Sequence, residues 1–450
     1  MQRNLLAKLI AWKQNEARKP LLIDGARQVG KTWLMQEFGK THYKKVAYIN
    51  FELDVAARAF FENNLYPEAI VNQIEYKVGF KIGAEDTLII FDEIQECNRA
   101  LASLKYFCEN APQYQIIAAG SLLGVAIHQG NSFPVGKVDR LELYPMSFAE
   151  FLNALDEKRY EMIIRDKNYR YLSAIESELI ARLKQYYFVG GMPKAVQTFV
   201  QTGDYDQVRN IQRDILRDYG SDFSKHIDAP SIPRVGLIWD SLPRQLAKEN
   251  KQFIYRDMKE GARASQFESA FYWLERVGLA YKINRIETPS LPLAAYGKDV
   301  FKLYMLDVGL LSACSGLTLQ NLAESDNKLF GQFKGALTEQ FVFQELKSLV
   351  LDSKIYYWAN DKSKGTAEVD FLIQFNGEII PIEVKAERNL QAKSLQAYIK
   401  YYQPKTAIRS SLGHYGKHDT IWDIPLYLIA EFGEIIGSKG AKQANCGSSV

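Results

Sequence analysis

The segment GARQVGKT is the clearest chemical motif of the chain. It matches the pattern GxxxxGK[ST] at every required position, directly after the apolar run of residues 21–23 and before an amphipathic stretch. Such a strand–loop–helix unit lets backbone N–H groups surround a polyphosphate. We therefore predict that the loop binds ATP, with a lysine on the terminal phosphates and a threonine hydroxyl on Mg²⁺. The predicted nucleotide-binding residues are Gly25, Ala26, Arg27, Gln28, Val29, Gly30, Lys31, Thr32 and Trp33.

Two carboxylates, Asp92 and Glu93, follow the apolar run of residues 88–91. Ligands of open α/β sheets bind beyond the carboxyl ends of the strands, so these side chains are expected at the nucleotide. Asp92 would hold Mg²⁺ through water, and Glu93 would act as general base on the attacking water. Consecutive acids favour a hydrolysing ATPase over a GTPase-like switch, and the guanine-reading sequence NKxD is absent.

Three further polar residues lie where the predicted strands end. Ser121 follows the strand at 116–119 and is expected beside the γ-phosphate, where it could sense hydrolysis. Arg140 has two interpretations that stay open: an arginine finger or sensor, and a surface salt-bridge residue. A finger acting in trans would require an oligomer. Asn50, after the strand at 46–49, is a weaker candidate.

A second constellation of charged residues lies in the last third of the chain. Asp370 belongs to one predicted strand, and Glu383 and Lys385 belong to the next, separated by an Asn-Gly turn. Residues two apart on a strand share a face, so Asp370 and Glu383 could hold one divalent cation. Lys385 would orient water or stabilise developing charge. Glu339, on the preceding predicted helix, could complete the metal shell. An acid followed by E-x-K is the pattern of PD-(D/E)xK nucleases, for which Mg²⁺ or Mn²⁺ is the expected metal.

The elements that position these residues indicate an α/β protein of several domains. Short apolar runs alternate with helical segments in residues 1–150, which predicts a parallel sheet covered on both faces. Residues 151–230 are expected to be a helical linker, and 231–325 follow the helix–helix–helix–hairpin order of a winged helix. Residues 326–436 are expected to be a nuclease-like α/β domain, and 437–450 a disordered tail.

Composition limits the function classes less than the motifs do. The chain has 450 residues, 56 basic against 53 acidic side chains and a net charge of +3, so charge alone does not argue for nucleic acid. The four cysteines form no CxxC, which excludes a zinc ribbon and suits a reducing compartment. No apolar run is long enough to span a bilayer. We expect a cytoplasmic protein without a membrane anchor.

The motifs in their order resemble a known family over residues 1 to 430. It comprises the bacterial and archaeal AAA-type ATP-binding proteins with a C-terminal DUF4143 region. The resemblance rests on GARQVGKT, LIIFDEIQE, LYPMSFAEFL, YYFVGGMPKAV, FKLYMLDVGLLSA, GALTEQFVFQEL and EVDFLIQ…IIPIEVKAE. It implies a P-loop ATPase core, a winged-helix-like middle and a C-terminal region similar to PD-(D/E)xK nucleases. The nuclease pattern usually has proline before its first aspartate, whereas Val369 stands there in this chain.

Three functions are compatible with these observations. The first is an ATPase whose nucleotide state controls a metal-dependent, nucleic-acid-cleaving domain. The second is an ATP-dependent regulatory or DNA-binding module with an inactive nuclease-like scaffold. The third is a nucleotide-switched adaptor between proteins. The intact Asp370, Glu383 and Lys385 favour the first, and the lack of net basic charge favours the other two.

Overall fold

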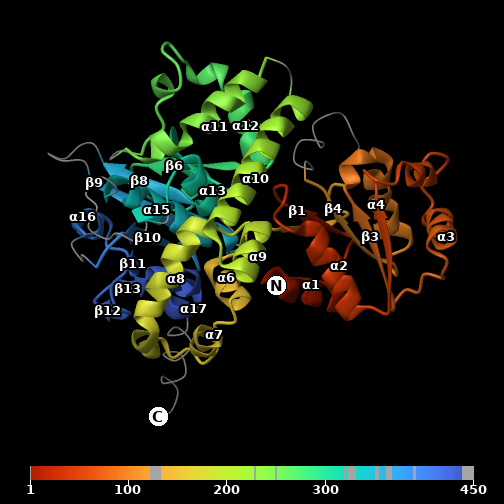
Figure 1. Ribbon diagram of the computed structural model, residues 1–450, viewed down its shortest axis with the longest axis horizontal. Coiled ribbons are helices and arrows are strands. Elements are labelled where there is room, and N and C mark those ends of the chain that lie inside the picture. The colour runs from red at the N-terminus through yellow and green to blue at the C-terminus, as the bar shows by residue number, and fades with distance from the viewer. Residues whose placement is uncertain are drawn as a thin grey trace. The chain divides into compact units, whose positions relative to one another are not determined.

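The computed structural model describes most of the chain, in two compact units. The described residues are 2–121, 133–227, 230–248, 251–318, 320–321, 331–349, 354–360, 367–388 and 392–437. The N-terminal unit comprises residues 1–144 with 272–279, and the C-terminal unit comprises the remainder (Figure 1). The predicted disordered tail lies outside the described residues, apart from Gly437.

A five-stranded parallel sheet forms the centre of the N-terminal unit. Its order is β2-β3-β4-β1-β5. The apolar runs of β3 and β4 are buried along their whole length, as expected for strands covered on both faces. The parallel sheet predicted for this part is therefore confirmed. The strands are β1 (Leu21–Asp24), β2 (Lys45–Asn50), β3 (Thr87–Asp92), β4 (Gln115–Ala119) and β5 (Asp139–Glu142).

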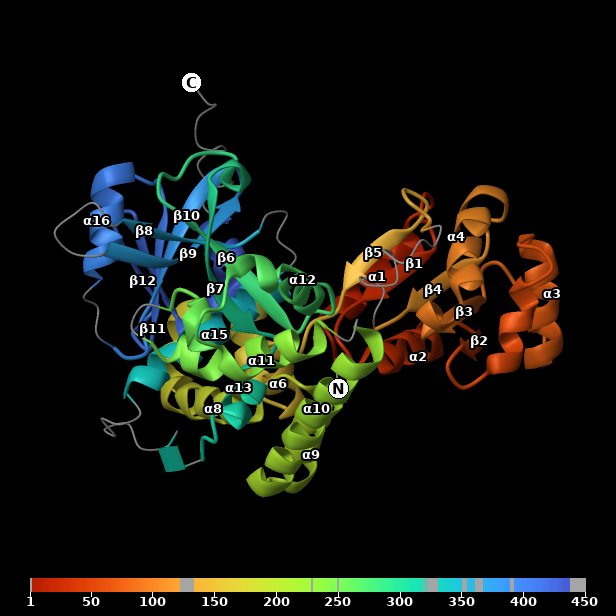
Figure 2. The same cartoon turned by 90° about the horizontal axis from the view of Figure 1, so that it is seen from above.

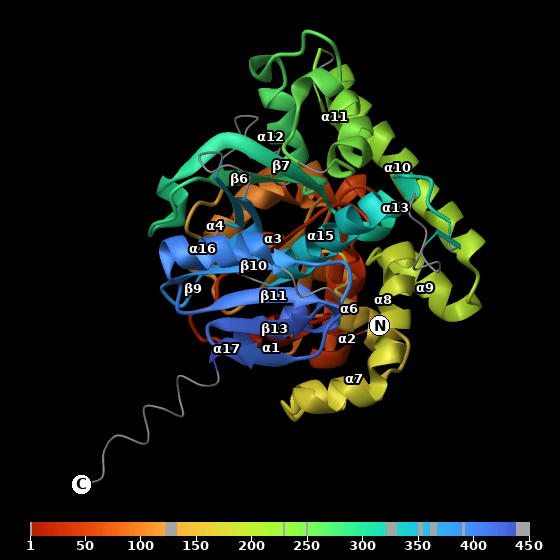
Figure 3. The same ribbon diagram turned by 90° about the vertical axis from the view of Figure 1, so that its left-hand side faces the viewer.

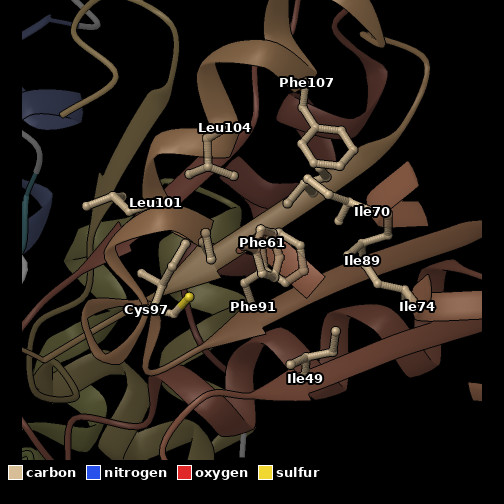
Figure 4. Close-up of a cluster of buried hydrophobic side chains, with 14 of the residues drawn as sticks. Ile49, Phe61, Ile70, Ile74, Ile89, Phe91, Cys97, Leu101, Leu104 and Phe107 are labelled. Atoms are coloured by element: carbon tan, nitrogen blue, oxygen red, sulfur yellow. The ribbon is translucent and has the colours of Figure 1, made fainter. Parts of the chain in front are cut away.

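Helices flank this sheet, and an aromatic cluster fixes one of its faces. Phe61 and Phe91 (Figure 4) meet edge to face with ring centroids 5.8 Å apart. The ring of Phe51 packs against both. Residues of α3, α4, β2 and β3, elements that lie near one another in Figure 2, belong to the same buried core as this cluster. The helical segments are α1 (Leu5–Gln14), α2 (Lys31–His42), α3 (Pro67–Val78), α4 (Asn98–Asn110), and the 3-10 turns η1 (Val55–Phe61) and η2 (Ile94–Glu96).

A helical layer begins the C-terminal unit, and a buried polar network joins its parts. Gly191 donates its N–H to Asp307 Oδ2 at 2.6 Å and accepts from the N–H of Met146 at 2.7 Å. A Cβ atom at Gly191 would lie 2.1 Å from the Met146 carbonyl oxygen, so glycine is required there. The helices are α6 (Phe148–Ala154), α7 (Lys158–Arg165), α8 (Glu176–Val189), α9 (Pro193–Thr202), α10 (Tyr205–His226), α11 (Ile232–Leu246) and α13 (Val308–Cys314), while α12 (Glu268–Arg276) crosses the division between the units.

An eight-stranded mixed sheet with the order β12-β13-β11-β10-β9-β8-β6-β7 completes this unit. Strands β9, β10, β11 and β13 run side by side in Figure 3. Helix α15 (Gly331–Ser348) contacts β7 and β10, and α16 (Lys393–Tyr402) packs on β9, where Trp358 and Tyr398 are buried. The strands are β6 (Ala280–Ile286), β7 (Gly297–Met305), β8 (Tyr356–Asn360), β9 (Ala367–Phe375), β10 (Glu378–Val384), β11 (Ala407–Ser411), β12 (Gly416–His418) and β13 (Ile421–Pro425); η7 (Leu426–Glu431) and α17 (Phe432–Gly437) follow.

The hairpin of β6 and β7 was expected to be the wing of a separate middle domain. Instead, β6 pairs in parallel with β8 over residues 284–286, so the hairpin extends the C-terminal sheet. This pairing satisfies backbone groups that an isolated hairpin would leave at an open edge. The boundary predicted between residues 325 and 326 therefore falls inside one continuous sheet. None of the described helices combines the length and apolar composition that a bilayer span needs.

Candidate nucleotide site and carboxylate cluster

The loop from Gly25 to Gly30 connects β1 to the start of α2, as the motif predicts. Gly25, Gln28 and Gly30 have positive φ angles of 143°, 65° and 96°, which bend the loop between the two elements. A Cβ at Gly25 would lie 2.3 Å from the carbonyl oxygen of Leu143, so this position also requires glycine. The first turn of α2 carries Lys31 and Thr32, and Trp33 is exposed beside them.

The buried ammonium group of Lys31 is held by the loop itself. Its Nζ donates to the carbonyl oxygens of Gly25 and Ala26, each at 2.8 Å. Burial lowers the pKa of Lys31 to about 8, although the nearby Glu93 and Asp92 act in the opposite direction. A buried cation that neighbouring carboxylates compensate only in part favours an incoming anion such as a polyphosphate.

Asp92 and Thr32 come together as a Mg²⁺ site requires. Asp92, the last residue of β3, is almost fully buried and is hydrogen-bonded to Thr32. Tyr48 on the neighbouring β2 also donates to its Oδ2 at 2.8 Å. Burial raises the pKa of Asp92 despite these hydrogen bonds, a sign that the carboxylate lacks a full cationic partner. A hydroxyl and a carboxylate are ligands that fit Mg²⁺.

Glu93 and Ser121 meet beside this pair. Ser121 Oγ lies 3.4 Å from Glu93 Oε2, so the side chains that follow β3 and β4 converge. Gln95, which the sequence analysis did not single out, donates to the same Glu93 oxygen at 2.6 Å. Glu93 has the left-handed φ of 49°, uncommon for a non-glycine residue and a feature of many functional turns. Its carboxylate is thus oriented by two donors.

Two other candidates have structural partners. Arg140 forms an ion pair with Asp24, Nη2 to Oδ2 at 2.8 Å, between β5 and the end of β1. This is the salt bridge of its second interpretation. Asn50 caps the turn after β2, since its Oδ1 accepts from the N–H groups of Glu52 and Leu53.

Arg3 is a residue that the sequence analysis missed. It is buried, and it donates to the carbonyl oxygen of Val29 at 2.8 Å and to that of Tyr144 at 2.6 Å. One guanidinium group therefore fixes the nucleotide loop to the segment after β5. The sequence offers no signal for this role, because the contact joins residues 26 and 141 positions apart.

Family models match three parts of the chain. An AAA domain covers residues 17–152, and two domains of unknown function, DUF8612 and DUF4143, cover residues 180–321 and 334–429. The chain thus contains an AAA domain and a DUF4143 region. The AAA match spans the loop, Asp92, Glu93, Ser121 and Arg140. No curated protein matches the chain.

Several solved structures are similar in fold. The Walker-type ATPase PABY2304 of Pyrococcus abyssi is 13% identical, with a TM-score of 0.41 over 70% of this chain and 95% of its own. The Aeropyrum pernix Orc1 protein in complex with DNA is 12% identical, with a TM-score of 0.27 over 70% and 93%. The Thermotoga maritima RuvB Holliday junction branch migration motor is 15% identical, with a TM-score of 0.28 over 63% and 87%.

The DUF4143 region holds a carboxylate cluster, which comprises the buried Glu339, Asp370 and Glu383 and the partly exposed Glu368. A β-bulge places Asp370. Tyr356 pairs with Leu372 but Trp358 pairs with Val369, so Asp370 and Phe371 together oppose the one residue between them. The Asp370 carboxylate then accepts from the N–H of Val384 at 2.7 Å, just beyond the last regular pair of β9 and β10.

Glu383 and Lys385 are close, as the E-x-K pattern predicts. Lys385 Nζ donates to Glu383 Oε1 at 2.7 Å, while Glu383 Oε2 is buried without a hydrogen-bond partner among the described residues. Burial raises the pKa of both Asp370 and Glu383; Glu339 acts in the same direction on both, and the nearby lysines act against it. This pair therefore has spare oxygen atoms and too little positive charge nearby.

Glu339 has a different environment. Its oxygens interact with Lys251, with Lys302 at 3.7 Å and with the Tyr304 hydroxyl at 3.1 Å. The two lysines hold the pKa of Glu339 at about 2 against the effect of burial. No group of three or more acidic, histidine or cysteine side chains is arranged to hold a metal ion among the residues that the structure describes. The metal shell predicted from Glu339, Asp370 and Glu383 stays a prediction, and two lysines already pair with Glu339.

Proposed function

We propose that the chain binds Mg²⁺-ATP at the edge of the parallel sheet and hydrolyses its β–γ phosphoanhydride bond. The convergence of Lys31, Thr32, Asp92 and Glu93 at one strand edge carries this proposal. Loop N–H groups and Lys31 would bind the phosphates. Thr32 and Asp92 would hold Mg²⁺, which neutralises charge that develops in the transition state.

Glu93 would act as the general base of hydrolysis. Its carboxylate accepts from Gln95 and lies within reach of Ser121, so it already has a defined orientation. Ser121 would adjoin the γ-phosphate. Arg140 would influence the site through Asp24, its ion-pair partner at the end of β1.

Measurement of phosphate release tests the ATPase proposal. Lys31→Ala should weaken ATP binding, and Glu93→Gln should retain ATP binding but lose at least a hundredfold in kcat, a typical value for a general base. Glu96→Gln is the matched control, since this neighbouring acid is exposed. Hydrolysis that survives Glu93→Gln undiminished would exclude Glu93 as the base.

We further propose that nucleotide state controls a metal-dependent, nucleic-acid-cleaving activity of the DUF4143 region. The adjacent Asp370, Glu383 and Lys385 support this step, because they supply two metal ligands and a cation next to them. The test is cleavage of labelled DNA and RNA, single- and double-stranded, with Mg²⁺ or Mn²⁺ and with or without ATP. Asp370→Asn should abolish cleavage while Asp419→Asn, at an exposed acid, should not.

A non-cleaving regulatory or DNA-binding module is the second candidate. It is favoured by the lysine contacts of Glu339, which leave fewer ligands for a metal. Intact ATPase activity without cleavage, together with nucleic-acid binding that weakens steeply with salt, would support this candidate. A nucleotide-switched protein adaptor would show neither cleavage nor binding to nucleic acid.

A further inference from the structure

Lysine side chains pair with the acids of the carboxylate cluster. Its four acids are accompanied by three lysines, Lys251, Lys302 and Lys385. Lys302 is fully buried on β7, where it forms ion pairs with Glu339 and Glu368. Its ammonium group also lies 4.9 Å from the ring centroid of Tyr357, the residue opposite the bulge.

Contacts between Phe253 and Phe301 on β7 fix the position of the segment that carries Lys251. Two residues later, the N–H of Phe253 donates to the carbonyl oxygen of Phe301 at 2.8 Å, and the two rings stack at 5.3 Å. The segment therefore runs along β7 and brings Lys251 to Glu339, with only 12% of the lysine side chain exposed. Burial of a cation to this degree is costly unless an acidic partner pairs with it.

The positive charge is unevenly distributed over the cluster. Lys251 and Lys302 both contact Glu339, whereas Asp370 has no ion-pair partner within 4.0 Å among the described residues, and Glu383 has only Lys385. A metal ion that used Glu339 would have to displace an ammonium group from a buried ion pair. Loss of one partner from such a pair is strongly destabilising, so the displacement opposes metal binding.

We infer that Lys251 and Lys302 take the place of a divalent cation at Glu339, so that the cluster binds metal weakly through Asp370 and Glu383 alone. This inference rests on the proposed metal-dependent function of the DUF4143 region and concerns its regulation. Lys251 is the more exposed of the two lysines. An oxygen of Glu339 becomes free for the metal when Lys251 is replaced by an uncharged residue, or when a ligand draws its ammonium group away from Glu339.

Mn²⁺ binding to the nucleotide-free full chain tests the inference directly. We would titrate Mn²⁺ by electron paramagnetic resonance, in an Asp92→Asn background that removes a carboxylate of the nucleotide site. Lys251→Met should bind Mn²⁺ at least tenfold more tightly than the background protein. Lys251→Arg, which keeps the charge, should bind as the background does. Addition of Asp370→Asn or Glu339→Gln to Lys251→Met should abolish the gain.

Each other outcome has a distinct meaning. Equal Mn²⁺ affinity with and without Lys251→Met would overturn the inference. A tenfold loss of affinity from Glu339→Gln in the background protein would also overturn it, because Glu339 would then be a ligand despite its lysines, but the metal-dependent proposal would stand. Absence of Mn²⁺ binding at millimolar concentration from both proteins would overturn the inference and the metal-dependent proposal together, while the ATPase proposal would be unaffected.

Discussion

Glu345 provides a quantitative test of how a buried carboxyl group makes the stability of the C-terminal unit depend on pH. It lies on α15, is fully buried, and accepts a hydrogen bond from the N–H of Phe148 at 2.8 Å. Burial raises its pKa from 4.5 to about 8, and the neighbouring Glu150 and Glu431 act in the same direction. Because folding protonates this carboxyl at neutral pH, its contribution to stability is full below pH 4.5 and is lost as pH rises towards 8.

The magnitude follows from the two pKa values. Each pH unit between them lowers the free energy of unfolding by about 1.4 kcal/mol, so at pH 7 the loss is roughly 3 kcal/mol. Glu345→Gln keeps an oxygen acceptor for the Phe148 N–H but does not titrate. The variant should therefore unfold at a higher temperature than wild type at pH 7.5, on the order of 5 °C higher.

The assay is thermal unfolding of both proteins from pH 5 to pH 8, followed by circular dichroism. The difference in Tm should shrink towards pH 5, where the carboxyl is protonated or nearly so in both states. Glu434→Gln, at an exposed acid of the same unit, is the control and should leave the Tm unchanged at every pH. A variant that is less stable than wild type at pH 7.5, or a difference independent of pH, would refute the reasoning.

Three further substitutions test particular contacts. Gly191→Ala should destabilise the C-terminal unit by about 3 kcal/mol or more, because the added Cβ overlaps a backbone carbonyl; chemical unfolding measures this. Arg3→Met should raise the KM for ATP roughly tenfold, with a smaller change in kcat, because the carbonyl of Val29 loses a charged donor. Asp423→Asn should cost about 3 kcal/mol in urea unfolding, because Arg409 then keeps a buried charge without its carboxylate.

The strand, loop and helix of the proposed nucleotide site could be predicted from the sequence because local patterns encode them. A glycine loop between a strand and a helix leaves few conformations, and a buried strand that ends in Asp92 fixes that carboxylate at the sheet edge. Gln95 and Tyr48 could not be predicted with equal ease. Their contacts with Glu93 and Asp92 depend on side-chain direction and on which strand lies beside β3.

The carboxylate cluster was predicted only in part. E-x-K places Glu383 and Lys385 together by simple alternation along a strand, but alternation fails at the bulge, where two successive residues oppose one. The burial of Lys302 could not be predicted from the sequence, because a lysine between Phe301 and Leu303 on a strand is expected to face solvent. The groups around it come from α15, β9 and β8, which are distant in the sequence, so no local pattern predicts its burial.

The two charged sites differ in the direction in which their lysines are perturbed. Desolvation dominates at Lys31 and lowers its pKa, so the acids around this lysine compensate its charge only in part, and the proposed polyphosphate would supply the rest. At Lys302 the neighbouring Glu368 and Glu339 outweigh desolvation and raise the pKa, so that lysine already has the anions it needs. The proposed nucleotide would therefore compensate the charge of Lys31. At the carboxylate cluster, by contrast, a metal ion at Glu339 would have to displace lysines that already pair with this acid.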